Sequence, residues 1–196
     1  MHMEERSAGG ISLVPIRTHL FDRRKVFITG EINMESANEF AQQILALNMR
    51  EEDGDKPIDV LINSPGGEIV AGMLMYDAIQ GSRAPVRVYC TGMAYSMGAI
   101  LLACGRERYI LPNSEAMIHE PLLGGGVRGS ASSIRSVSEN LQEVRSKMNR
   151  ILARHTGRSI EEIEKATAYD HYMTPEECVE FGLCDGIVDF SSLMEG

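Results

Sequence analysis

One serine stands where a β-type run of the sequence gives way to a short apolar helical run. Ala94 and Gly98 flank Ser96 at positions −2 and +2, and small residues at both places let the backbone turn sharply. In a nucleophile elbow, such a turn exposes the serine hydroxyl for attack on a carbonyl carbon, while N–H groups at the start of the following helix stabilise an oxyanion. Serine is also a favoured helix N-cap, so this segment alone supports both interpretations.

A serine nucleophile needs a base, and His119 is the histidine best placed to supply one. It ends the apolar stretch Ala116–His119, just before a proline and a glycine-rich loop, so its ring can face the floor of a cleft. A single histidine of this kind is more often a structural residue. The acid that would orient the imidazole is Asp170 or Asp185, and the periodicity of the sequence does not choose between them.

A second signal lies in Ser64-Pro65-Gly66-Gly67, directly after a predicted strand. Two glycines allow the backbone to approach a ligand closely and to point N–H groups at it, which suits an oxyanion, although a plain β-to-α turn is an equal alternative. The sequence contains neither a P-loop pattern nor His-Glu-x-x-His or a similar metal-ligand spacing. We therefore expect no metal and no organic cofactor.

Strands and helices alternate along most of the chain. Apolar, β-branched runs predict strands at Lys25–Thr29, Ile58–Ile62, Pro85–Cys90, Arg108–Leu111 and Ala116–His119. Helical periodicity predicts helices over Ser36–Met49 with Asn33 as N-cap, from the double glycine to about Gln80, and over the wholly apolar Met97–Ala103. A turn is expected over Thr91–Ser96 and a loose tail over residues 1–12. This alternation predicts an α/β domain with mostly parallel pairing.

The most regular segment follows the glycine-rich loop. Its apolar residues are spaced 3, 4, 3, 4 and 3 apart, at Ile134, Val137, Leu141, Val144, Met148 and Ile151. A helix of about 25 residues, roughly 38 Å long, is longer than a domain of this size needs to cover its own sheet. Its narrow stripe favours a projecting handle that packs on another helix, with a long core helix as the alternative. Capping boxes predict two later helices that begin after Ser159 and Thr174.

Composition excludes several classes of function. The 196 residues, 43% hydrophobic and 24% charged, suit one compact domain. A net charge of −9 leaves no positive excess for binding nucleic acid. The four cysteines form no Cys-x-x-Cys pair and lie mostly in apolar runs, which suits buried thiols in a reducing compartment. Without an apolar run long enough for a signal region or a membrane span, we expect a cytoplasmic protein with no membrane partner.

Seven short motifs follow one another along the chain. They are Asn63-Ser64-Pro65-Gly66-Gly67, Gly72–Asp77 (GMLMYD), Ala94–Gly98 (AYSMG), Leu111–Ser114 (LPNS), Met117–Pro121 (MIHEP), His155-Thr156-Gly157 and Met173–Gly182 (MTPEECVEFG). One such motif would be a weak signal, but seven collinear ones make coincidence implausible. With these motifs, the sequence over about residues 24–190 resembles the proteolytic subunits of the Clp protease family.

The resemblance implies a role for each candidate residue. Ser96 corresponds to the family's nucleophile and His119 to its general base. Of the two candidate acids it selects Asp170, which lies just before the late capped helix. The oxyanion donors are the backbone N–H groups of Gly67 and Met97. The implied activity is that of a serine-type endopeptidase with a Ser-His-Asp triad.

The resemblance also implies how substrate is held. Family members bind peptide as an added strand, here between Gly67, Glu68 and Ile69 on one side and Leu122–Gly125 on the other. Substrates would be unfolded polypeptides, recognised mainly through their backbone. The proteolytic subunits of this family form two stacked heptameric rings, and AAA+ Clp unfoldases supply chains to them using ATP.

The implied fold is crotonase-like, a spiral of β-β-α units with a protruding helix-strand handle over about residues 122–156. Residues 25–190 would form a single peptidase domain. An N-terminal tail with a shortened axial segment would occupy residues 1–24, and a C-terminal tail residues 191–196.

Four departures distinguish this chain from the family pattern. Tyr95 replaces a common alanine beside the nucleophile, and Glu68 puts a carboxylate next to the implied oxyanion hole. His171 stands where many relatives have an arginine that pairs with the opposite ring, which predicts ring pairing that depends on pH. The segment between Pro15 and Lys25 is about a dozen residues shorter than usual.

Two other functions are weighed against the peptidase. A crotonase-type acyl-CoA enzyme would use the same two-loop oxyanion hole on a thioester. Such enzymes rely on a Glu or Asp acid/base and on basic groups for the CoA phosphates, whereas this chain offers an ordered Ser, His and Asp. A catalytically silent subunit of a mixed ring is the second alternative.

Overall fold

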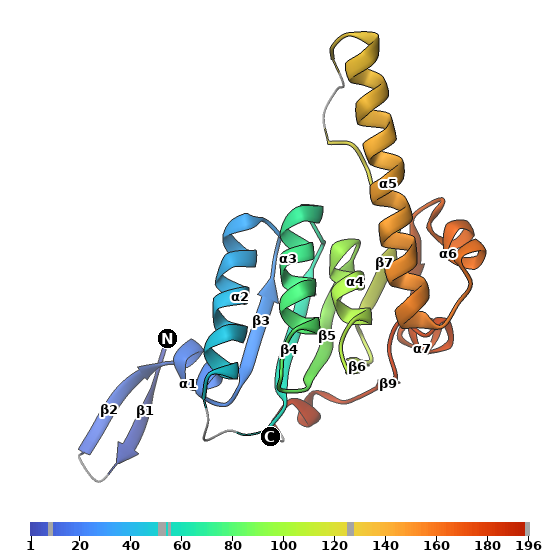
Figure 1. Ribbon diagram of the computed structural model, residues 1–196. Helices are drawn as coiled ribbons and strands as arrows, with labels where there is room; N and C mark the ends of the chain where they lie inside the picture. Colours follow the sequence, from blue (N-terminus) through green and yellow to red (C-terminus); the bar gives the residue numbers. More distant parts are fainter. Residues whose placement is uncertain (8–9, 51–53, 55, 125–127, 195–196) are drawn as a thin grey trace.

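The fold is built on one seven-stranded, mainly parallel sheet with helices on one of its faces (Figure 1). The computed structural model describes residues 1–7, 10–50, 54, 56–124 and 128–194. The strands are β1 (His2–Ser7), β2 (Gly10–Pro15), β3 (Lys25–Thr29), β4 (Ile58–Ser64), β5 (Val86–Tyr95), β6 (Glu107–Ile110), β7 (Glu115–Ile118), β8 (His171–Met173) and β9 (Gly186–Ile187). The helices are α1 (Ile16–Asp22), α2 (Met34–Asn48), α3 (Ile69–Gln80), α4 (Met97–Ala103), α5 (Ala131–Thr156), α6 (Ile160–Thr167), α7 (Pro175–Phe181) and the 3₁₀ helix η2 (Phe190–Met194).

The strand order of the sheet branches at β5. Strands β3, β4, β5, β6 and β9 are neighbours in that order and pair in parallel. The first part of β5 pairs with β6, its last residues pair in parallel with β7, and β8 runs antiparallel to β7. This confirms the predicted α/β fold with mostly parallel pairing and is consistent with a crotonase-like architecture.

Strand β5 is longer than predicted, and the turn expected over Thr91–Ser96 is wrong for all but its last residue. A register shift in β4 between Ile62 and Ser64 brings Ser64 opposite Ala94, so pairing resumes on that side. On the other side, β7 supplies a new partner for the end of β5. Gly92, in the middle of the run, hides this continuation in the sequence because glycine is depleted from strands.

Figure 1 shows α2, α3 and α4 side by side across one face of the sheet. Helix α2 begins after Asn33, whose side-chain oxygen accepts a hydrogen bond from the Ser36 N–H while the Ser36 hydroxyl accepts one from the Asn33 N–H, both at 3.0 Å. This is the predicted cap. Every residue of α4 is buried, as its apolar sequence predicts, because this helix runs through the core.

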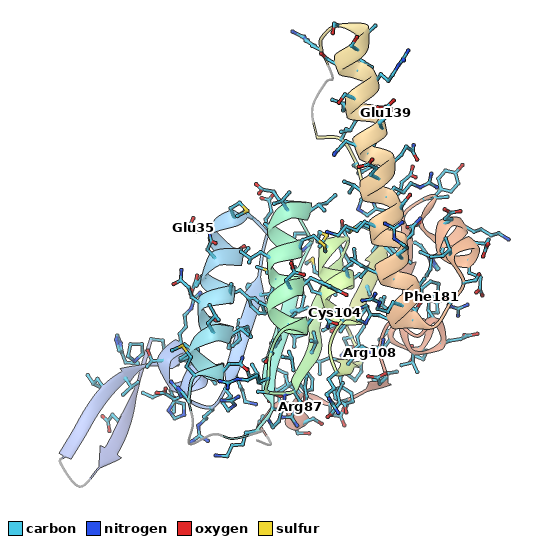
Figure 2. The ribbon with its side chains drawn as sticks, viewed as in Figure 1. Glu35, Arg87, Cys104, Arg108, Glu139 and Phe181 are labelled. Atoms are coloured by element: carbon cyan, nitrogen blue, oxygen red, sulfur yellow. The ribbon has the colours of Figure 1, made fainter. Side chains whose placement is uncertain are left out.

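The opposite face of the sheet is only partly covered. Leu61 of β4 and Tyr89 of β5 pack there against Leu193 of η2, so this residue of the expected C-terminal tail is buried. On the same face, Asp59 accepts a hydrogen bond of 2.6 Å from Arg87, which Figure 2 labels. The end of the chain thus covers one part of the sheet.

The first residues form a hairpin where a loose tail was expected. Strands β1 and β2 pair antiparallel from His2 opposite Pro15 to Ser7 opposite Gly10. Figure 1 shows the hairpin standing away from the sheet, at the end of the molecule opposite α5. The sequence signal for this hairpin is the apolar, partly β-branched run after Gly10, which the charged residues before it obscure.

Helix α5 has 26 residues and projects beyond the sheet, as its apolar stripe predicts (Figure 1). Its last turns pack on the fold, whereas the side chains of residues 131–140 are exposed. The expected strand of the handle is not formed at residues 121–124 and 128–130, and Gly125 lies outside the described residues. No strand of the described chain lies beside this glycine-rich segment to complete a ladder. Within the described residues, no helix combines the length and apolarity needed to cross a membrane.

Candidate functional site

Ser96 stands at the junction between β5 and α4 with an unusual backbone conformation. Its φ is 52° and its ψ is −117°, and Arg24 is the one other described non-glycine residue with positive φ. Such a conformation costs of order 1 to 3 kcal/mol and persists only where the surroundings impose it. The Ser96 side chain makes no capping hydrogen bond among the described residues, so the helix N-cap interpretation does not account for it. The geometry is that of a nucleophile elbow.

Neighbouring segments hold this turn in place. The Ser96 N–H donates to the carbonyl of Met117 at 2.8 Å, which joins the turn to β7. Gly66 has φ +93°, and a Cβ added to it would lie 2.8 Å from the Cβ of Ser96. Gly67 has φ +150°, and a Cβ there would lie 2.1 Å from the carbonyl oxygen of Ile32. Gly66 is therefore required for the close approach to the Ser96 turn, and Gly67 for the close approach to the backbone of Ile32.

The backbone N–H groups of Gly67 and Met97, beside the serine turn, find no acceptor in the described part of the chain. Gly67 forms a parallel bridge with Ile32 in which Ile32 donates to Gly66 and Glu68 donates to Ile32, each at 2.8 Å. This pattern leaves the Gly67 N–H facing away from the bridge. Met97 is the first residue of α4, where helix N–H groups lack an intrahelical acceptor. These two groups are the predicted oxyanion donors.

Ser96 and His119, both half-buried, line the same small cavity of about 20 Å³. Most of its other walls are apolar, and the complete lining is Ile69, Ser96, Met97, Ile100, Ile118, His119, Pro121, Met148, Asn149 and Leu152. The fold thus brings the predicted nucleophile and the predicted base together from segments on different strands. Among the described residues, no hydrogen bond joins the Ser96 hydroxyl to the His119 ring.

Asp170 lies opposite His119 in the continuation of a strand pair. The antiparallel register of β7 and β8 pairs Ile118 with His171, so the next pair outward is His119 with Asp170. The N–H of Glu120 donates to the carbonyl of Thr167 at 2.8 Å, which keeps the two chains together beyond this point. Asp170 is exposed and does not line the cavity, and no hydrogen bond to His119 forms among the described residues.

The alternative acid, Asp185, is engaged elsewhere. Its carboxylate accepts hydrogen bonds from the backbone N–H of Arg108 at 2.8 Å and from the Arg108 guanidinium. The same guanidinium donates to the carbonyls of Ala103, His155 and Gly182, at the ends of α4, α5 and α7. Figure 2 shows Arg108 in this region. Asp185 therefore has a structural partner at a distance from the cavity.

Of the described residues expected to hold a peptide, Ile69 is the one that lines the cavity. Glu68 is exposed, and Ile69 is half-buried and contributes to the cavity wall. Leu122 is 71% exposed and makes no strand pairing in the described chain. Among the described residues, the carboxylate of Glu68 makes no hydrogen bond or ion pair.

Asn149 is a site residue that sequence reasoning missed. It is 2% exposed, lines the cavity, and its side-chain nitrogen has no hydrogen-bond partner among the described residues. A buried amide donor without an acceptor costs free energy, so its presence at a cavity points to a ligand or water that accepts from it. The sequence signal was a polar amide directly beside Met148 in the buried half of α5.

His155 was expected to be exposed and is instead half-buried. Its Nε2 lies 3.0 Å from the hydroxyl of Tyr76. Burial, followed by the nearby charges of Arg108 and Arg154, lowers the pKa of His155 below its ordinary value. The contact with Tyr76 joins α5 to α3. The four cysteines are buried and free, as predicted.

A parallel sheet, a protruding helix and a serine in a nucleophile-elbow conformation together define an α/β protein of the crotonase-like class. The family model of the Clp proteases matches residues 8–191, nearly the whole chain, and the chain belongs to the Clp protease family. The resemblance carried by the seven sequence motifs is thereby confirmed.

Proposed function

We propose that this chain is a serine endopeptidase that hydrolyses peptide bonds of unfolded polypeptides. The observation that carries the proposal is the strained Ser96 turn, whose hydroxyl is not used as a helix cap and which shares a cavity with His119. Backbone strain at a polar residue beside a cavity is characteristic of a functional site. Membership of the Clp protease family supports the same conclusion.

In the proposed mechanism, His119 accepts the proton of the Ser96 hydroxyl as its oxygen attacks the peptide carbonyl. The carboxylate of Asp170 orients the imidazole and stabilises the imidazolium that forms. His119 then donates the proton to the leaving amine, and water hydrolyses the acyl-enzyme by the same route. The two gaps between these groups, which lack hydrogen bonds in this structure, must close by side-chain rotation when substrate binds.

The tetrahedral intermediate carries a negative oxygen that needs donors. We assign this role to the N–H groups of Gly67 and Met97, because both lack an acceptor in the described chain and flank Ser96. Each donor of this kind is worth roughly 3 kcal/mol of transition-state stabilisation. The glycine at position 66 lets the backbone come close to the Ser96 turn.

The substrate would bind as an extended strand between Gly67–Ile69 and the segment at Leu122. Main-chain hydrogen bonds then supply most of the affinity, which suits unfolded chains of varied sequence. The small, mainly apolar cavity beside Ser96 has room for about one water-sized group and would adjoin the bound chain. Met97 and Met148 in its wall are adaptable, and the unpaired amide of Asn149 would donate to the bound chain.

We further propose that residues 25–190 form the peptidase domain of a double-ring assembly of two heptamers, to which an AAA+ Clp unfoldase delivers substrates. The support is the family and the exposed apolar stripe of the projecting half of α5, which has coiled-coil spacing. The four buried free thiols suit a cytoplasmic, reducing location.

A fluorophosphonate probe tests the activity directly. The native chain should be labelled at Ser96 and should cleave a short fluorogenic peptide, and both signals should disappear in Ser96→Ala and fall at least about a hundredfold in His119→Ala. Native mass spectrometry of the same samples reports the assembly. Assembled rings without labelling or cleavage would identify a silent subunit instead.

The two aspartates provide a matched pair for the acid. Asp170→Asn should reduce kcat by about a thousandfold or more with an unchanged thermal midpoint, because the imidazole loses its orienting carboxylate. Asp185→Asn should lower the thermal midpoint, because it weakens the partner of Arg108, and should leave kcat nearly unchanged. The reverse pattern would contradict the assignment of Asp170.

A further inference from the structure

Three side chains from three neighbouring strands meet directly behind the Ser96 turn. The hydroxyl of Tyr95 donates a hydrogen bond to Oε1 of Glu115 at 2.5 Å. The ring of Tyr95 meets the ring of Tyr172 edge to face, with centroids 5.6 Å apart. Tyr95 is the last residue of β5, Glu115 lies on β7 and Tyr172 on β8. We refer to these three residues as the Tyr95 cluster.

The sheet register puts the Tyr95 cluster on the face opposite the cavity. Met117 pairs with Tyr95 across β5 and β7, and with Tyr172 across β7 and β8, so the two rings flank Met117 in one row. Side chains alternate between faces along a strand, and Ile118, the next residue, lines the cavity. The cluster therefore lies on the face of the sheet opposite Ile118, and none of its members lines the cavity.

We propose that the Tyr95 cluster positions the catalytic groups, an inference that rests on the peptidase function proposed above. Each member belongs to a strand that ends next to one proposed catalytic residue. Ser96 directly follows Tyr95 at the end of β5. His119 directly follows β7, which contains Glu115, and Asp170 directly precedes β8, which contains Tyr172. One set of contacts between these strands fixes all three catalytic residues relative to one another.

The strained backbone explains why such a set is needed. Ser96 keeps φ 52° only if its neighbours prevent the chain from relaxing, and Tyr95 forms the preceding peptide bond. A hydrogen bond to a carboxylate is among the stronger ones in proteins. This bond to Glu115, together with burial, raises the pKa of Tyr95 to about 12, so its hydroxyl remains a donor at neutral pH.

Tyr95→Phe tests the cluster with a minimal change, because it removes the hydroxyl and keeps the ring against Tyr172. We expect kcat for a short fluorogenic peptide to fall about fivefold to tenfold, with KM within about twofold. The rate of fluorophosphonate labelling at Ser96 should fall by the same factor, at an unchanged thermal midpoint. Glu115→Leu should reduce kcat by the same factor. Glu115→Gln should keep most of the activity, because it retains a hydrogen-bond acceptor. The double variant Tyr95→Phe with Glu115→Leu should lose no more activity than either single variant.

Tyr109→Phe is the matched control. The Tyr109 hydroxyl donates to the carboxylate of Glu107 at 3.0 Å, in the same sheet but on β6, which carries no proposed catalytic residue. This variant should keep the native kcat. Native labelling and kcat in Tyr95→Phe would overturn the positioning role alone. An equal loss of kcat in Tyr109→Phe would overturn it as well. So would a loss of kcat in Tyr95→Phe that is accompanied by a matching fall in the thermal midpoint. A native chain without label at Ser96 would overturn the peptidase function and the cluster's role together.

Discussion

The two halves of α5 lie in different surroundings although one apolar stripe runs along both. In the half near the sheet, Met148, Ile151 and Leu152 are buried. In the projecting half, Ile134 is 46% exposed, and Figure 2 shows Glu139 on the part of the helix that stands clear of the fold. The near half lines the cavity of the proposed site, and the far half contacts none of it.

This difference teaches that the spacing of an apolar stripe predicts that one face of the helix is buried. The spacing does not identify the element that buries it. The spacing of three and four residues continues without a break from Ile134 to Ile151. Within the described chain, only the second half of that stripe packs against other elements, mainly α4 and α6. The first half has the spacing of a helix that packs on another helix. We thus propose that the projecting half of α5 serves assembly and that the half near the sheet lines the candidate site.

The largest expected effect comes from charges on the far half. Ile134→Asp combined with Val137→Asp should abolish assembly, because an unpaired carboxylate is costly to bury between helices. Native mass spectrometry measures this. The control combines Ser132→Asp with Ser136→Asp on the opposite face of the helix and should assemble normally. Unchanged mass in the stripe variant would remove the distinction between the halves.

Shortening one buried side chain in the half of α5 near the sheet should have the next largest effect. Leu152 is 2% exposed, and Leu152→Ala should lower the free energy of unfolding by about 3 kcal/mol, through lost burial and the space left behind. Ile134→Ala should change it by less than about 0.5 kcal/mol. Urea unfolding at concentrations where the chain is monomeric provides the measurement. Equal losses would show that both halves are packed in the single chain.

The caps of α5 sharpen the comparison at a smaller scale. Gly157 ends the helix with φ 74°, and Gly157→Ala should destabilise the protein by about 1 kcal/mol, because a side chain disfavours this conformation. Ser130 caps the other end by accepting from the Ser133 N–H at 3.2 Å. Ser130→Ala should cost only a few tenths of a kcal/mol in global unfolding, because the exposed turn opens locally. Hydrogen exchange should show faster opening there. A global loss as large as that of Gly157→Ala would argue against local opening.

The smallest expected effect is a pH dependence of the protein's stability, and it involves only the half of α5 near the sheet. Because burial lowers the pKa of His155 in the folded state, the unfolded state binds a proton first as the pH falls below the ordinary value of 6.5. The contribution of His155 to the free energy of unfolding should therefore be fully present above pH 6.5 and should decline as the pH falls below it. Thermal midpoints between pH 5 and 7.5 measure the decline. His155→Gln should flatten that slope and His2→Gln should retain it, whereas the same slope in both would assign it to other groups.

Sequence patterns predicted best the elements whose signals are local. Strand β3 and helix α4 begin and end at the predicted residues. The caps at Asn33, Ser159 and Thr174 all form as expected. A cap joins residues three apart, and an apolar helix needs only its own composition to require burial, so nothing from the rest of the chain had to be known.

Features that depend on distant segments were not predictable in the same way. Strand β5 continues to Tyr95 because β7 pairs with it there. His155 is half-buried because Tyr76, 79 residues earlier, lies against it. The environment of Asn149 exists only once α5 has packed beside α4. Local periodicity carries no information on any of these contacts.

The residues of the candidate site also separate into those with local sequence signals and those without. Ser96 and His119 could be proposed from their own turns and strand ends, which are local features. The choice between Asp170 and Asp185 needed the family resemblance and stays a prediction. The register of β7 and β8 aligns Asp170 with His119, while Arg108 binds Asp185.

The bonds of Arg108 couple the ends of three helices to a segment that comes much later in the sequence. Its guanidinium binds carbonyls at residues 103, 155 and 182 and the carboxylate of Asp185. Asp185 lies 77 residues after Arg108 and directly before β9. The charge of this arginine is neutralised only when the segment that leads into β9 has packed against β6. The ends of α4, α5 and α7 therefore become fixed to one another late, as one cooperative step of folding.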